Sequence, residues 1–120
     1  MLKEYSYPKA GQKNLRRRWF LDESMDLIIW VDRSGSIQNF QLCYSKQENE
    51  RALVWDPIKG CRHFRVDSGE PGPLKNLSPM MEEDERVDIG WLRRSFGQRA
   101  REIDVAVRDF VRSTLRGYGE

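Results

Sequence analysis

The chain has little of several features that mark special classes of protein. Only two of its 120 residues are cysteines, Cys43 and Cys61, whereas a secreted disulfide scaffold would carry more of them, at loop positions. No run approaches the length of about 18 apolar residues that a membrane-spanning helix needs, and residues 1–14 lack the apolar core of a signal peptide. We therefore expect a cytosolic protein, cytoplasmic in localisation, with both thiols reduced and no membrane partner.

An excess of one charge is also missing. The 21 basic and 19 acidic residues leave a net charge of +2, which gives no bulk attraction to nucleic acid or to an anionic membrane. The chain has one histidine, no glycine-rich phosphate loop and no serine–histidine–aspartate pattern. The sequence therefore favours a protein that is not an enzyme and that holds no metal and no cofactor.

What the sequence does contain is a series of short aromatic-rich runs separated by turn residues. Each run either alternates apolar with polar residues or is apolar on both pleat faces, which is typical of strands. A shorter apolar piece, WFL, precedes them near residue 18. Together they predict a four- to five-stranded antiparallel meander sheet over residues 18–67, built from DLIIWVD (26–32), SIQNFQLCY (36–44), RALVW (51–55) and CRHFRVD (61–67).

The turn after the first of these runs has a recognisable chemistry. Gly35 can adopt the positive φ that a tight hairpin requires, and the carboxylate of Asp32 can accept hydrogen bonds from the turn amides. In the last run, Phe64 and Val66 alternate with Cys61, His63 and Arg65. This alternation predicts that His63 is half-exposed on a largely polar face.

The hydrophobic period changes to that of a helix in the last third of the chain. We expect two helices, over residues 86–96 and 104–116. The acidic residues 82–85 suit the start of the first and Gly97 its end, while Asp104 can cap the second. One bent helix through Gly97 stays open as an alternative.

These elements predict a single α+β domain over residues 15–116, with both helices packed on one sheet face. A polar N-terminal arm (1–14) precedes it, and a Pro/Gly-rich loop (67–80) connects sheet and helices. Strands apolar on both faces would leave Ile28 and Trp30, or Leu53 and Trp55, in water. On this ground we expect a homodimer.

A polar patch on the meander is the first candidate binding site. Asn39 belongs to it, and if the strands turn their polar faces to the same side, four further side chains would converge there beside a tryptophan. The residues of this candidate ligand site are Gln41, Cys43, His63 and Arg65. The solvated face of an antiparallel sheet accounts for the same pattern.

A basic and aromatic run near the N-terminus is the second candidate. Charge next to stacking surface is what single-stranded nucleic-acid binders use, and the C-terminal helix is also basic. The residues are Arg16, Arg17, Arg18 and Trp19. The balanced net charge makes nucleic acid the less favoured partner.

Four stretches of the chain carry a family resemblance: RRWF, DLIIWVDRSGSIQNFQLCYSK, ERALVW and HFRVDSGEPG. This pattern resembles a group of small bacterial proteins of unassigned function, and it runs from Arg16 to the C-terminal helix. The resemblance implies a free-standing, single-domain bacterial protein and transfers no activity or site residues.

The leading functional hypothesis is thus a non-catalytic interaction or assembly module that associates with itself or with a protein partner. A small-molecule binder or small enzyme using the sheet face around His63 is the first alternative. A single-stranded nucleic-acid binder using residues 16–19 and the basic C-terminal helix is the second.

Overall fold

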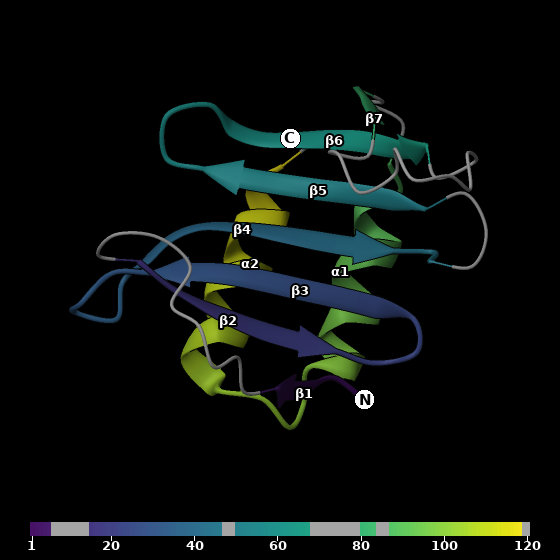
Figure 1. The fold of residues 1–120 in the computed structure, drawn as a ribbon. Coiled ribbons are helices and arrows are strands. Elements are labelled where there is room, and N and C mark those ends of the chain that lie inside the picture. Colours follow the sequence, from purple (N-terminus) through teal and green to yellow (C-terminus); the bar gives the residue numbers. More distant parts are fainter. Residues whose placement is uncertain (6–14, 47–49, 68–79, 84–86, 119–120) are drawn as a thin grey trace, which may run out of the picture.

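The structure, a computed structural model, describes residues 1–5, 15–46, 50–67, 80–83 and 87–118. It confirms the α+β class, with an antiparallel sheet and two C-terminal helices. Figure 1 shows both helices on the same face of the sheet, where they run across the strands. The strands lie side by side in chain order: β1 (Lys3–Tyr5), β2 (Arg16–Leu21), β3 (Met25–Val31), β4 (Ile37–Tyr44), β5 (Arg51–Asp56), β6 (Gly60–Asp67) and β7 (Met80–Glu83).

The sheet is larger than the sequence predicted, with seven strands instead of four or five. The short strand β1 comes from the predicted N-terminal arm and pairs with β2. The other addition, β7, pairs with β6 and takes up acidic residues that were expected at a helix start. Most of the predicted loop, residues 68–79, lies outside the described part of the chain.

Side chains on the strands alternate strictly between the two faces of the sheet. In β3 every second residue from Met25 to Val31 is buried, and the residues between them are only partly buried. The register carries this alternation across the sheet, so that Leu42, Leu53 and His63 follow Leu27 in one cross-strand row. We call the face under the helices the covered face. We call the opposite face the open face, because no described helix or strand lies over it (Figure 1).

The helices α1 (Ile89–Arg99) and α2 (Val105–Gly117) complete the core. Each fully buried aliphatic or aromatic side chain stabilises the fold by about 1.5–3 kcal/mol relative to its exposure. Phe110 of α2 is partly buried and packs edge-on against Trp55, with ring centroids 5.1 Å apart. The fully buried contributions of the helices to the core are Leu92, Phe96, Val107, Val111 and Leu115.

Two separate helices form, not one bent helix, because both have their own caps. The carboxylate of Asp88 accepts from the backbone N–H of Trp91, and that of Asp104 accepts from Ala106, as the sequence predicted for the second helix. The first helix was predicted three residues too early at both ends, with Gly97 expected to end it. Gly97 instead lies inside α1, where a methyl group would sit 3.4 Å from Nε of Arg112 on α2. This is an ordinary van der Waals contact with a flexible side chain, so Gly97 does not end the helix and α1 continues through it.

The hairpin between β3 and β4 forms as predicted. One carboxylate oxygen of Asp32 accepts hydrogen bonds from the backbone N–H groups of Ser34 and Ser36, at 2.9 and 3.0 Å. Gly35 has a φ of +90°, which residues with a side chain rarely adopt. The register shifts between Trp30 and Val31, so that Val31 pairs with Ile37, while Trp30 and Asn39 keep the register of the rest of the β3–β4 ladder.

A buried carboxylate ties the sheet to the end of α1. The side chain of Asp22 is 2% exposed, and its Oδ1 accepts from the backbone N–H groups of Ser24 and Met25. Its Oδ2 accepts from the guanidinium of Arg99 at 2.9 Å. Burial alone would raise the pKa of Asp22, but these hydrogen bonds and the Arg99 charge outweigh it and hold the pKa below its ordinary value.

Removing the Arg99 side chain should therefore destabilise the protein. We expect Arg99→Ala to lower the free energy of unfolding in urea by about 2 kcal/mol near neutral pH, since a charged hydrogen bond to a buried group is lost. Arg101→Ala, at an exposed arginine that donates to the Gln98 carbonyl, is the matched control and should change it by less than about 0.5 kcal/mol.

The same pair of variants has a predicted pH dependence. A carboxylate with a lowered folded-state pKa stabilises the fold fully above its ordinary pKa of 3.8, and this stabilisation is lost as the pH falls through the lowered value. The difference between wild type and Arg99→Ala should therefore shrink in acid. Equal losses in the two arginine variants, or a difference independent of pH, would contradict this role for Asp22.

Candidate functional site

The open face of the sheet carries a mixture of aromatic, amide and basic side chains that are neither buried nor fully exposed. Cross-strand register places Ile28, Gln41, Val54 and Arg62 in one row, and Arg17, Trp30 and Asn39 in the next. Such a mixture of stacking surface and hydrogen-bonding groups is typical of binding surfaces. The partly buried residues of this face include Arg17, Trp19, Ile28, Trp30, Asn39, Gln41, Val54, Arg62 and Phe64.

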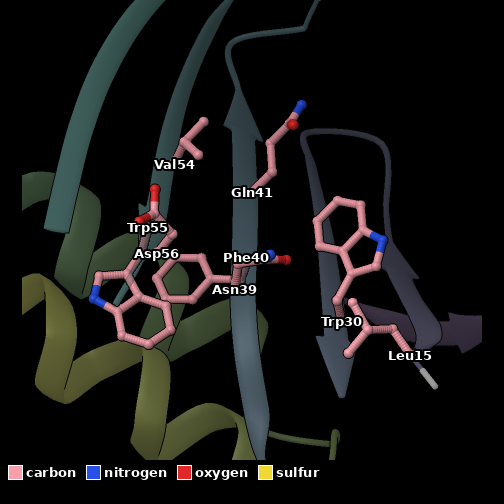
Figure 2. A pocket seen from close by; sticks show the side chains of 8 residues that line it. All are labelled: Leu15, Trp30, Asn39, Phe40, Gln41, Val54, Trp55 and Asp56. Atoms are coloured by element: carbon pink, nitrogen blue, oxygen red, sulfur yellow. The ribbon is translucent and has the colours of Figure 1, made fainter. Parts of the chain in front are cut away.

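A pocket of about 290 Å³ lies at the end of this face near the β3–β4 turn. Figure 2 shows Trp30 and Leu15 on one side of β4, and Val54 and Asp56 on β5 at its other side. The amides of Asn39 and Gln41 project from β4 between these two sides. Phe40 and Trp55 complete the lining, although their rings stack at 5.9 Å on the covered face. The pocket thus has two largely apolar walls and a polar floor.

The amide of Asn39 is the most unusual group in this pocket. Its carbonyl oxygen is buried, yet it accepts no hydrogen bond from any residue in the described part of the chain. A buried acceptor without a donor costs about 1–3 kcal/mol of folding free energy. A group that donates to Asn39 would recover this energy, so the residue favours a ligand with an N–H or O–H donor.

A charged pair borders the pocket beside Val54. Asp56 accepts at Oδ1 from the backbone N–H groups of Ile58 and Lys59, at 2.9 and 2.8 Å. The pKa of Asp56 lies below its ordinary value, mainly because of the hydrogen bond from the Lys59 backbone N–H. The carboxylate is therefore ionised near neutral pH. Its Oδ2 lies 3.6 Å from Arg62, whose guanidinium covers the Phe64 ring at 5.4 Å.

The structure does not bring the four predicted ligand-binding residues together. Gln41 and Cys43 lie on the open face, where the Gln41 amide donates to the Cys43 sulfur at 3.3 Å. His63 belongs to the row of Leu42 and Leu53 on the covered face, and the alternation of β6 sends Arg65 to the same side. The expectation that all four share one face is wrong, because the alternation of β6 is opposite to the one assumed.

His63 is a core residue, and the prediction that it is half-exposed is therefore wrong. Its exposure is 1%, and its Nε2 lies 2.6 Å from the hydroxyl oxygen of Tyr44. Trp91 of α1 contacts Tyr44 from the helix side, with ring centroids 5.7 Å apart. Phe64, which the pattern placed in the core, lies instead on the open face opposite Ala52. The hydrogen bond to Tyr44 explains how a polar ring is tolerated in the core.

The basic run near the N-terminus is also divided between the two faces. Arg17 and Trp19 lie on the open face beside Trp30 and Ile28. Arg18 points to the covered side, where it binds Glu4 at 2.7 and 2.8 Å and Asp104 at 3.3 Å. Arg16 is exposed at the start of β2. The basic helix α2 lies over the covered face (Figure 1), whereas Trp19 lies on the opposite, open face.

Neither thiol has the properties of a nucleophile. Burial raises the pKa of Cys43 to about 11, and burial also raises the pKa of Cys61 to about 11. Nucleophilic cysteines need the opposite shift, from a nearby positive charge or a helix N-terminus. Both thiols are free of disulfide bonds, as the sequence predicted.

Sequence reasoning missed most of the pocket walls. Asn39 and Gln41 were recognised through the alternation of their strand, and a tryptophan was expected nearby. Leu15, Val54 and Asp56 were not singled out, because only the pairing of β4 with β5 places two of them beside the amides. The pairing of Trp30 with Asn39 depends on the register of β3 against β4, which the sequence of a single chain does not show.

No family model, curated protein or solved structure matches this chain. The resemblance to a group of small bacterial proteins therefore stays a prediction. Within the described ranges, no group of three or more metal-ligating side chains comes together. None of the described helices is long and apolar enough to span a membrane.

The raised thiol pKa values predict slow alkylation of the folded protein. A pKa of about 11 in place of 9.0 lowers the thiolate fraction about a hundredfold near neutral pH. We expect iodoacetamide to modify Cys61 in a Cys43→Ser variant, and Cys43 in a Cys61→Ser variant, at least about a hundred times more slowly than in concentrated urea. The rate for the folded protein should rise with pH up to about 11. Comparable rates in the folded and unfolded protein would contradict the raised pKa values, and a faster rate in the folded protein would show that a thiol is activated.

Proposed function

We propose that this protein is a non-catalytic binding module and that its binding surface is the open face of the sheet. The observation that carries the proposal is the pocket between Trp30 and Val54, with the unpaired amide oxygen of Asn39 at its floor. Small-molecule sites combine apolar walls with a few convergent polar groups in this way. We place the protein in the bacterial cytosol, where free thiols such as Cys43 and Cys61 stay reduced.

The distribution of reactive groups supports binding over catalysis. The open face holds the amides and one thiol, while the histidine lies on the covered face with its ring bonded to Tyr44. The sheet separates Cys43 from His63, which excludes hydrogen bonding between them as nucleophile and base. Cys61 lies on the same face as His63, but burial raises the pKa of its thiol to about 11, which disfavours a nucleophilic thiolate. The lowered pKa of Asp56 leaves it without a proton near neutral pH, so it is unsuited to act as a general acid. The open face is therefore better suited to holding a molecule than to transforming one.

Self-association through the same face is a second candidate function. Ile28, Trp30 and Val54 are partly buried apolar side chains on the open face, and the face carries both signs of charge, at Asp56 and Arg62. A mixed-charge patch suits a twofold interface, in which the same surface meets itself. Only Trp30, of the two tryptophans predicted for this interface, is available, since Trp55 packs against Phe110.

A substitution that fills the pocket tests whether a ligand binds on the open face or elsewhere on the protein. We expect native mass spectrometry of wild type, isolated without denaturation, to show a small added mass that is lost on denaturation. Val54→Phe should abolish the added mass because the larger ring occupies the pocket. Val105→Phe makes the same change at a residue that is 55% exposed at the start of α2, and it should retain the added mass.

The same spectra test the second candidate. A doubled mass without an adduct, converted to the monomer by Val54→Phe and not by Val105→Phe, would favour self-association through the open face. A monomer without any adduct, together with an NMR fragment screen in which no compound shifts the Trp30 or Asn39 signals, would contradict the proposed binding surface.

A further inference from the structure

The pocket on the open face has a shape and a hydrogen-bonding character that identify a class of ligand. We propose that it binds a flat nitrogen heterocycle of the nucleobase type, with its polar edge on the floor formed by β4, and that it prefers bases with an exocyclic amino group. This inference rests on the proposed binding function and names the ligand class for it.

The walls of the pocket favour a flat ring. Trp30 on β3 and Val54 on β5 stand on the strands at either side of β4, and these strands are about 9.5 Å apart, which is twice the spacing of paired strands. Val54 stands one cross-strand row along from Trp30, so a planar ring placed edge-on over β4 would lie obliquely, with one face on the indole and the other toward the valine methyl groups. Stacking of a base on an aromatic side chain contributes about 1–3 kcal/mol to binding.

The floor of the pocket favours hydrogen-bond donors on the edge of that ring. The amide oxygen of Asn39 is buried and receives no hydrogen bond from the described residues. Asp56 adds an ionised carboxylate whose Oδ2 is 3.6 Å from Arg62, beyond hydrogen-bonding distance. Both groups are acceptors. In base recognition, asparagine contacts the amino group of adenine and aspartate that of cytosine, whereas thymine and uracil present a carbonyl at this position.

The charges around the pocket fix which end of a nucleotide can enter. The Asp56 carboxylate lines the pocket itself and would repel a phosphate placed there. Arg17 is the cross-strand neighbour of Trp30 on the side away from Asn39. A phosphate or sugar would therefore stay outside, toward β2, while the base enters. This arrangement suits a free nucleoside or nucleotide and equally a base of a single-stranded nucleic acid, since both present the same ring.

NMR provides a direct test, because tryptophan indole N–H and asparagine side-chain amide signals are resolved from the backbone. Uniformly ¹⁵N-labelled protein would be titrated with cytidine, adenosine, guanosine, uridine and methyl glucoside, and Trp30→Phe would assign the Trp30 indole signal. We expect cytidine, adenosine or guanosine, whose bases all carry an exocyclic amino group, to shift the Trp30 and Asn39 signals. Uridine should bind at least about tenfold more weakly, the lower end of what one good base contact contributes.

Two variants and a control connect this selectivity to the pocket. Asn39→Ala and Asp56→Asn should each reduce the preference for cytidine or adenosine over uridine, while Gln98→Ala, an exposed amide on α1, should leave it unchanged. Unfolding in urea, measured for each variant, shows whether the fold is retained. If one of these variants unfolds, Val54→Phe serves instead, because it should stay folded while its larger side chain blocks the pocket and prevents binding.

Short homopolymers then distinguish the two sources of the ring. Binding of an oligocytidine or oligoadenosine that is much tighter than that of the nucleoside, and that weakens steeply with salt, would identify a single strand as the ligand. Equal affinity for nucleoside and oligonucleotide would identify the free metabolite. Either result supports the inference.

Other outcomes overturn it in distinguishable ways. Equal binding of uridine and cytidine, or shifts caused by methyl glucoside and not by any nucleoside, would reject the nucleobase class and leave the binding function intact. Absence of any shift at Trp30 and Asn39 with these probes and with a general fragment library would reject the inference and the binding function together.

Discussion

The register of the antiparallel sheet is the constraint on which the rest of this structure depends. Side chains on a strand alternate with a period of two, so the pairing of β4 with β5 and of β5 with β6 decides which row lies under the helices. The observed register puts Leu42 and Leu53 beneath them and leaves Gln41 and Val54 on the other face. A slip by one residue would exchange these rows, burying amides and exposing the core.

This division separates the polar groups that stabilise the fold from those that are available for binding. On the covered side, buried polar groups have partners within the chain: His63 has Tyr44, and Asp22 has Arg99 together with two backbone amides. On the open face, the Asn39 oxygen has none among the described residues. The protein tolerates this cost of about 1–3 kcal/mol where the helices do not reach. Such a local departure from full hydrogen bonding is what a binding site is expected to show.

Much of the fold could be predicted from the sequence because it depends on local chemistry. Three predicted features form as expected, and each depends only on residues close to it in the chain. They are the alternation in residues 26–44, the turn with Asp32 and Gly35, and the helix cap at Asp104. The extra strands could not be predicted so easily. Residues 3–5 carry no apolar alternation, and they form β1 only because β2 offers a partner edge.

The site was harder to predict because it depends on long-range pairing. The composition of β6 suggests that Phe64 is buried and His63 half-exposed, yet the bond to Tyr44 and the packing under α1 reverse this order. The two-sided apolar character of residues 27–31 correctly indicated a strand inside the sheet. It could not indicate that Trp30 would stand beside Asn39, since that pairing depends on the register of β3 against β4.

The assignment of residues to the two faces is tested most directly by alanine substitution along β4, with the free energy of unfolding in urea as the measurement. Phe40→Ala and Leu42→Ala should each destabilise the protein by about 2–5 kcal/mol, because each leaves a cavity under the helices. Asn39→Ala and Gln41→Ala should each change the free energy of unfolding by less than about 1 kcal/mol or increase it. The first substitution removes an unpaired acceptor, and the second affects a side chain that is only partly buried. Large losses of stability at Phe40 and Leu42 with small changes at Asn39 and Gln41 would support the assignment of the two faces. Losses of similar size at all four positions, or an alternation of opposite phase, would contradict it.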